Sequence, residues 1–196
     1  MNYAFRAARA ALNLSLISMV TTLSMAADFD GSWWKAAPPE ERRGFLEGYI
    51  DCHTYDLGRG RSYKESTYVY AQRINEAVQE DLQDLHTPVV TLLQREHRPV
   101  IINGSAAERL KPRHGYHNGA FWRSSEAPLK LGFVEGYLWC QSHEVYSSSK
   151  PRFLKPPSEY VKLISKWYGT SDSDERLINP ERESVAIPDA LQKILR

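Results

Sequence analysis

Apolar residues recur at helical spacing over much of the chain. Between residues 67 and 82, Val69, Ile74 and Val78 fall on one face of a helix, and Ser66 stands where a helix-capping residue is expected. The other face of this segment is mostly polar. The pattern therefore predicts an amphipathic helix with one buried face.

Start and stop signals indicate further helices. Residues 38–41, Pro-Pro-Glu-Glu, place prolines and acids in a first helical turn, and this helix is expected to end near 57–58. Segments 98–117 and 169–186 are expected to be loops, with a short strand at 100–102. The remaining predicted helices begin at Glu126 or cover 89–94, 158–168 and 188–195. The predicted fold class is all-α, with about six helices.

A signature W-x9-G-F-[L/V]-E-G-Y-x-x-C occurs twice. Residues 31–55 align without gaps over 119–143, an offset of 88, and eight of the 25 aligned pairs are identical. Average residue usage would give about one or two identities by chance. The identical pairs are Gly31/Gly119, Trp34/Trp122, Gly44/Gly132, Phe45/Phe133, Glu47/Glu135, Gly48/Gly136, Tyr49/Tyr137 and Cys52/Cys140.

Weaker matches extend the repeat. Residues 66–69 resemble 158–161 at an offset of 92, and Pro88 and Pro188 each precede a short helical pattern. We therefore expect a duplicated three-helix unit, packed as one compact pseudo-two-fold domain over 27–196. The copies are predicted at 27–117, which includes the connecting loop, and at 118–196.

Small residues form a stripe along the signature helix. Gly44, Gly48 and Cys52 stand at i, i+4 and i+8 and so lie on one face, and Gly132, Gly136 and Cys140 repeat the arrangement. Each glycine costs a helix about 1 kcal/mol relative to alanine. We expect close approach of the two signature helices to be the reason for them, with Trp34, Tyr49, Trp122 and Tyr137 packing around the crossing.

The N-terminal residues predict export. Residues 1–9 carry two arginines and no acid, and an apolar run from 10 to 23 ends in Ser24-Met25-Ala26. This is the pattern of a secretory signal peptide, here 1–26, and the run is short for a membrane-spanning helix. The alternative is an uncleaved anchor. We expect cleavage after Ala26 and a periplasmic or secreted protein with no membrane segment after cleavage.

The two cysteines fit this compartment. They occupy equivalent positions in the signature, and an oxidising environment favours a disulfide between Cys52 and Cys140. The alternative is a pair of buried thiols that do not meet. Loss of residues 1–26, which hold two arginines, changes the formal charge from +1 to −1. Nucleic acid is therefore not an expected partner.

Two acids stand in an apolar context. Glu47 and Glu135 are flanked by Gly, Phe, Tyr and aliphatic residues, so each carboxylate must be paired or have its pKa displaced. One interpretation is structural, with bonds to the indoles of Trp34 and Trp122 or to Lys35 and Arg123. The other is a twinned acid site for acid–base chemistry or metal binding. Duplication favours the structural interpretation, since a catalytic site needs one copy.

Histidines supply a second hypothesis. His114 and His117 form H-x-x-H ahead of the second copy, where they could bind a metal together with an acid, but the first copy has no counterpart. Solvated or hydrogen-bonded histidines are the simpler interpretation. The sequence has no phosphate-binding glycine loop, nucleophile elbow or dinucleotide fingerprint, so no cofactor is expected.

These observations favour a non-enzymatic exported protein that binds a protein partner in the envelope. The G-Y-x-x-C helix of each copy resembles the helices of Tai-type immunity proteins, and this resemblance implies binding of a toxin. The alternatives are a hydrolase that uses Glu47 or Glu135 with a histidine, with or without a metal, and a structural element of the envelope. If the protein binds a partner, we expect the binding surface to lie in the loops that differ between the copies.

Overall fold

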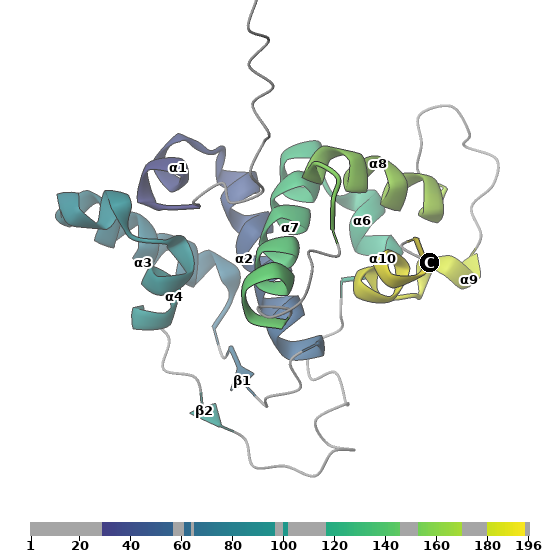
Figure 1. The fold of residues 1–196 in the computed structure, drawn as a ribbon, viewed down its shortest axis with the longest axis horizontal. Coiled ribbons are helices and arrows are strands. Elements are labelled where there is room, and N and C mark those ends of the chain that lie inside the picture. The colour runs from purple at the N-terminus through teal and green to yellow at the C-terminus, as the bar shows by residue number, and fades with distance from the viewer. Residues whose placement is uncertain are drawn as a thin grey trace, which may run out of the picture.

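The computed structural model describes most of the chain after residue 28 (Figure 1). The described segments are 29–56, 61–63, 65–96, 100–101, 117–145, 153–169 and 180–194. Helices dominate them, so the predicted all-α class is confirmed. The predicted signal peptide and His114 lie outside these segments. None of the described helices has the length and apolarity that a membrane span requires.

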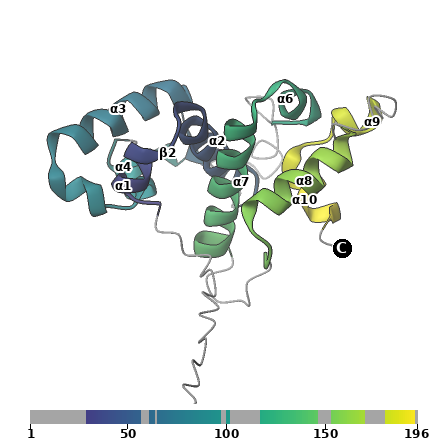
Figure 2. The same cartoon turned by 90° about the horizontal axis from the view of Figure 1, so that it is seen from above.

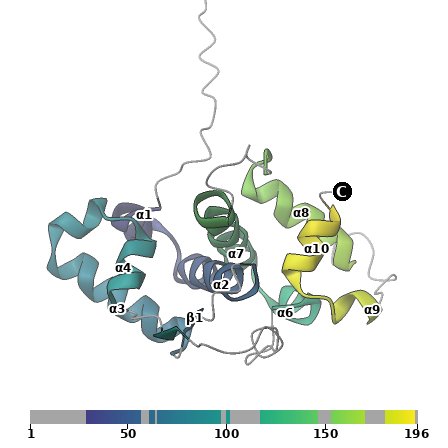
Figure 3. The same ribbon diagram turned by 60° about the horizontal axis from the view of Figure 1, so that its bottom comes forward.

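Two helices cross at the centre of the molecule, α2 (Pro39–Tyr55) and α7 (Ala127–Cys140). They pack against each other more extensively than any other pair of described elements. Figures 2 and 3 show one group of helices on each side of this crossing. The central pair therefore joins the two sides.

The N-terminal helix group lies on one side of the crossing and the C-terminal helix group on the other (Figure 3). The former comprises α1 (Gly31–Ala36), α3 (Thr67–Glu80), a 3-10 helix (Leu82–His86) and α4 (Val89–Glu96). The latter comprises α6 (Gly119–Ser124), α8 (Pro157–Tyr168), α9 (Pro180–Glu183) and α10 (Ile187–Ile194). A π-helical turn, Gln141–Val145, extends α7.

The prediction of about six helices is too low for the described residues. The helices α1 and α6 have six residues each, too few to show helical periodicity, and their N-caps are the side chains of Asp30 and Asn118. The helix α9 lies inside the predicted loop 169–186. The short strand is present as β2 (Val100–Ile101), which pairs antiparallel with β1 (Arg61–Ser62).

Buried aromatic residues form matching hydrogen bonds inside the two groups. The indole of Trp34 donates to Asn75 Oδ1 at 2.7 Å, and the indole of Trp122 donates to Ser165 Oγ at 3.0 Å. Asn75 and Ser165 are 90 residues apart. Equivalent hydroxyls of α3 and α8 show the same spacing, since Tyr70 and Tyr160 accept backbone N–H groups of Glu65 and Lys155 at 3.3 Å each. The offset of 92 from the sequence match is therefore wrong by two residues.

Candidate functional site

The four glycines of the signature helices lie where α2 and α7 cross. Each faces the backbone of the other helix so closely that a Cβ atom would overlap a carbonyl oxygen. The overlapped carbonyls belong to Leu129 at Gly44, Phe133 at Gly48, Glu41 at Gly132 and Phe45 at Gly136. The stripes of small residues therefore serve as the contact surface between the two helices.

A disulfide fixes the same crossing. Cys52 and Cys140 are bonded, with an S–S distance of 2.02 Å and a Cα–Cα distance of 6.2 Å, and both residues are fully buried. The predicted bridge is confirmed. It links two positions 88 residues apart in sequence and joins the C-terminal parts of α2 and α7.

Two buried tyrosines reach across the crossing in opposite directions. The hydroxyl of Tyr49 in α2 donates to Glu144 Oε1 at 2.6 Å, just beyond α7. The hydroxyl of Tyr137 in α7 donates to Asp56 Oδ2 at 2.7 Å, just beyond α2. Burial, followed by the charges of Tyr63 and Glu144, raises the pKa of Tyr49, so this hydroxyl stays a proton donor.

Each acceptor carboxylate has a second neighbour from the opposite helix. Gln141 Nε2 donates to Asp56 Oδ2 at 2.6 Å, and His53 Nε2 lies 2.6 Å from Glu144 Oε2. The approach of His53 lacks hydrogen-bond geometry, and its Nδ1 has no hydrogen-bond partner among the described residues. His53 is fully buried, so its ring stays in place by packing against the rings of Tyr49 and Tyr63.

Glu47 belongs to an ion-pair cluster around His117. The Nε2 atom of His117 lies 2.5 Å from Glu47 Oε2, and its Nδ1 atom lies 2.9 Å from Asp51 Oδ2. Glu47 also accepts from Thr67 Oγ1 at 3.1 Å and lies 3.5 Å from Arg43 Nε. The cluster therefore ties the segment just before α6 to α2.

The cluster holds charge in fixed positions. Burial alone would lower the pKa of His117, but hydrogen bonds and charges from Asp51 and Glu47 raise it to about 9. For Glu47, burial opposes ionisation, yet His117, Thr67 and Arg43 lower its pKa. Burial raises the pKa of Asp51. At neutral pH the imidazolium is thus paired with the Glu47 carboxylate, and neither serves as a free base.

Glu135 has no equivalent cluster. Its Oε2 atom is buried without a hydrogen-bond partner among the described residues. Burial, with a smaller contribution from the charge of Glu41, raises the pKa of Glu135 to about 8. The residue 88 positions before His117 is Phe29, whose ring packs 4.8 Å from that of Phe45. An apolar ring thus occupies the position that would supply a cation to Glu135.

The proposed partners of the two glutamates need correction. The indoles of Trp34 and Trp122 bind Asn75 and Ser165, as described above, and Arg123 pairs with Glu183 at 3.1 Å. Glu47 takes His117, a residue that the sequence suggested only as a weak metal ligand. The offset-88 comparison would reach His117 and Phe29 only if extended two residues before the matched window.

The two signature glutamates do not form a shared acid site in the described part of the chain. In the described part of the chain, Glu47 and Glu135 have separate surroundings, and no contact joins the two carboxylates. Nor do these residues include three His, Cys, Asp or Glu side chains placed to hold a metal ion. The arrangement supports a role for both acids in packing and stability.

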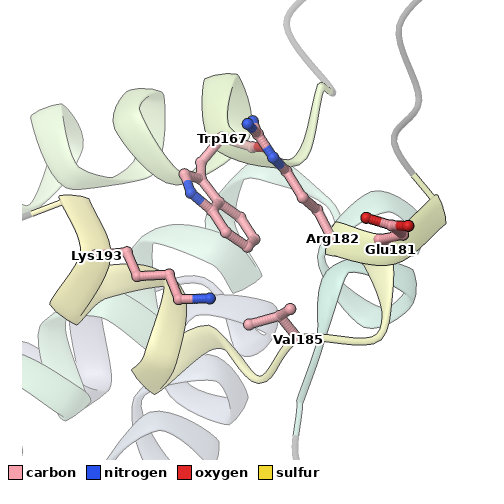
Figure 4. Close-up of a pocket in the computed structure, with 5 residues that line it drawn as sticks. All are labelled: Trp167, Glu181, Arg182, Val185 and Lys193. Carbon is pink, nitrogen blue, oxygen red and sulfur yellow. The ribbon is translucent and has the colours of Figure 1, made fainter.

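A surface pocket of about 490 Å³ lies between α8, α9 and α10 (Figure 4). Its basic residues, Arg182 and Lys193, lie 5.2 and 5.7 Å from the centre of the Trp167 indole. Arg182 also donates to the backbone oxygen of Trp167 at 3.1 Å. The lining is completed by Val185 and Glu181. Indole and cations together make this pocket a candidate site for an anionic group.

Comparison of the chain with protein-family models, curated proteins and solved structures found no match. The contacts described above therefore carry the functional argument.

Proposed function

We propose that this chain is an exported binding protein that loses residues 1–26 and recognises a protein partner in the periplasm or outside the cell. The buried Cys52–Cys140 bridge supports this location, because disulfides persist in oxidising compartments. N-terminal sequencing of the exported protein tests the first step. Material that begins at Ala27 supports it, and material that begins at Met1 contradicts it.

The proposal includes a duplicated unit with pseudo-two-fold symmetry. Reciprocal contacts across the crossing support it: Tyr49 reaches Glu144 and Tyr137 reaches Asp56, with each pair offset by 88 residues. The glycine contacts are reciprocal in the same way. In a duplicated fold, residues kept in both copies serve the fold, and residues that differ are free to serve binding.

One observation carries the preference for binding over catalysis. His117 is held as a cation between Glu47 and Asp51, so the signature's acid is committed to an ion pair that joins two parts of the chain. The surface, in contrast, exposes large apolar side chains at Tyr68 and Leu154 and the indole-lined pocket. Aromatic and basic groups of this kind are enriched where proteins bind proteins.

The experiment is capture followed by reconstitution. Tagged protein starting at Ala27 is incubated with envelope extract and culture fluid, and a captured protein is then purified and titrated by calorimetry. A saturable one-to-one complex supports the proposal. The resemblance to Tai-type proteins makes secreted toxins the first class of partner to screen, with loss of toxin activity as the readout. Failure to form any complex with captured proteins contradicts the proposal.

The alternative function is hydrolysis that uses Glu47 with His117. The specific observation in its favour is their 2.5 Å approach. Glu47→Gln removes the acid and keeps the shape of the side chain. If this variant folds but loses a measurable reaction of the purified protein, the alternative is supported. If the reaction persists in the folded variant, the alternative is excluded for this acid.

A further inference from the structure

The segments that lead into α4 and α10 have the same backbone contacts. The N–H of Thr87 donates to the carbonyl of Asp84 at 3.2 Å, and the N–H of Val185 donates to that of Arg182 at 3.0 Å. The first residues of the two helices, Val89 and Ile187, then bond to the carbonyls of Phe29 and His117. The residues of each pair Asp84/Arg182, Thr87/Val185 and Val89/Ile187 are 98 positions apart. Asp84 and Arg182 thus occupy equivalent positions.

The charges at these positions differ between the two helix groups. In the N-terminal helix group, Arg95 Nη1 lies 2.7 Å from Asp84 Oδ1, and Thr87 Oγ1 donates to the same oxygen at 3.1 Å. The residues 98 positions later are Lys193 and Arg182. A salt bridge in one group therefore corresponds to two cations in the other, and no salt bridge within the described residues neutralises either cation.

The indole of Trp167 lies between these two cations. Trp167 occupies the position 90 residues after Ala77, the offset that relates α3 to α8. Figure 4 shows Lys193 and Arg182 on different sides of the Trp167 ring, with Val185 between their helices. Both cations face the π-system, which partly offsets their mutual repulsion. An acidic group beside either cation would be attracted to both positive charges.

We propose that this pocket binds an acidic segment of the protein partner, with carboxylates beside Arg182 and Lys193 and an aliphatic stem against Trp167 and Val185. The inference rests on the proposed function and specifies the chemistry of the partner. Glu181 also lines the pocket, so its charged groups sum to one positive charge. Because the two cations lie on different sides of the Trp167 ring, separate carboxylates of an acidic segment match them better than one compact phosphate. Tryptophan and arginine are the residues most enriched at binding hot spots.

The test uses the protein starting at Ala27, labelled with ¹⁵N, and follows the indole N–H signal of Trp167, assigned with Trp167→Phe. The probe is a hexaglutamate peptide, and hexaglutamine and inorganic phosphate are the comparison ligands. We expect a saturable shift of the Trp167 signal with hexaglutamate and none with hexaglutamine. Arg182→Gln and Lys193→Gln should each weaken binding about tenfold, because each removes a charge-assisted contact.

Lys162→Gln is the matched control, because it removes one positive charge from an exposed position on α8. It should change hexaglutamate binding less than about twofold at 0.15 M salt, where distant charges are screened. Glu181→Gln should tighten binding. Thermal unfolding of each variant confirms that it folds. The inference is overturned if Arg182→Gln and Lys193→Gln bind hexaglutamate as tightly as Lys162→Gln and Glu181→Gln do. It is also overturned if the protein binds phosphate more tightly than hexaglutamate.

A captured partner separates this inference from the proposed function. If the partner binds the Arg182→Gln and Lys193→Gln variants as tightly as the parent protein, the pocket is excluded as its site while the proposed function stands. If hexaglutamate binds at Trp167 but no partner forms a complex, the pocket's chemistry is supported and the proposed function fails. Loss of partner binding in both folded variants supports both.

Discussion

At the scale of single residues, the two signature glutamates have the same sequence context and different electrostatics. Glu47 is ionised beside His117, whereas Glu135 is buried near Glu41 and its pKa is raised to about 8. His117, Thr67 and Arg43 lower the pKa of Glu47, whereas the residues 88 positions from His117 and Arg43 are the apolar Phe29 and Leu131. The free energy of unfolding should therefore depend on pH in a different way for each glutamate.

Replacement of Glu135 by glutamine should stabilise the protein at neutral and alkaline pH. Because the folded-state pKa is raised above the usual 4.5, the wild-type protein loses stability as pH rises from about 4.5 through about 8. Glu135→Gln removes this loss. We expect its free energy of unfolding to exceed that of the parent by about 1–2 kcal/mol at pH 8 and by little at pH 4.5. Urea unfolding at both pH values measures the difference.

The exposed acid Glu159 provides the control for that substitution, because its side chain is 52% exposed and lies on α8. Glu159→Gln should change stability by less than about 0.5 kcal/mol at either pH. A Glu135→Gln variant that is less stable than the parent at pH 8 would show that the carboxylate has a partner, and the proposed burial without one would be wrong.

His117 stabilises the folded protein in its charged form, whereas Glu135 does so in its neutral form. Its folded-state pKa is raised from 6.5 to about 9, so its contribution is fully present below about pH 6.5 and is lost as pH rises through about 9. His117→Phe copies the residue at the equivalent position, Phe29, and leaves two acids without their cation. We expect a loss of about 2–3 kcal/mol at pH 6 and a smaller loss at pH 10.

The double variant His117→Phe/Glu47→Gln tests whether the loss comes from the unpaired acid. It should recover part of the stability that His117→Phe loses at pH 6. An equal loss at pH 6 and pH 10 in the single variant would assign the effect to packing against Phe121 and Phe133 instead of to charge.

The sequence predicts part of this picture. Apolar neighbours indicate that Glu47 and Glu135 are buried, but not what they bind. His117 lies 66 residues from Asp51, and this contact depends on how the segment before α6 folds back onto α2. A local pattern carries no information on such pairs. The suggested indole partners failed because Trp34 and Trp122 face α3 and α8, which supply their own polar groups.

At the scale of helices, the crossing of α2 and α7 is the element that the sequence predicts best. Small residues four apart define a face, and two such faces favour close packing. The short helices α1 and α6 could not be predicted from periodicity, although each begins with a capping residue, Asp30 or Asn118. The offset of 92 between α3 and α8 pairs Tyr68 with Tyr160, but Tyr68 is exposed, and the buried Tyr70 is the residue that makes the same hydrogen bond as Tyr160.

The crossing makes a prediction about Gly48. Replacing a glycine by alanine inside a helix usually stabilises it by about 1 kcal/mol. At Gly48 the added Cβ atom would overlap the carbonyl oxygen of Phe133, so the helices must move apart. We expect Gly48→Ala to lower the free energy of unfolding by about 2–4 kcal/mol, as overpacking in a core does. Chemical unfolding followed by circular dichroism measures the change.

Gln79→Ala, at an exposed position of α3, is the matched helix substitution. It should be neutral or slightly stabilising, within about 0.5 kcal/mol. If Gly48→Ala behaves in the same way, the two helices do not approach each other closely at this glycine, and the small residues repeated in α2 and α7 do not serve as their contact surface.

At the scale of the whole molecule, the two helix groups resemble each other in their interior and differ at the surface. Both place a tryptophan, Trp34 or Trp122, in full burial, yet only the C-terminal helix group replaces a salt bridge by cations around Trp167. The sequence predicted the shared interior because packing repeats the same residues. It could not predict the pocket, because equivalent positions are 90 residues apart in α3 and α8 but 98 residues apart in α4 and α10.

The Cys52–Cys140 disulfide covalently links the two central helices, α2 and α7, which lie between the two helix groups. It closes a loop of 88 residues, and the chain-entropy model gives such a bridge roughly 4–5 kcal/mol of stabilisation, with less often measured. We expect Cys52→Ala/Cys140→Ala to lose about 2–5 kcal/mol by urea unfolding, and reduction of the parent to approach the same value. The variant itself should be insensitive to reductant. Alkylation of the non-reduced parent, followed by intact-mass measurement, should add no alkyl group. Two added groups would show free thiols, and the crossing would then be stabilised by glycine packing alone.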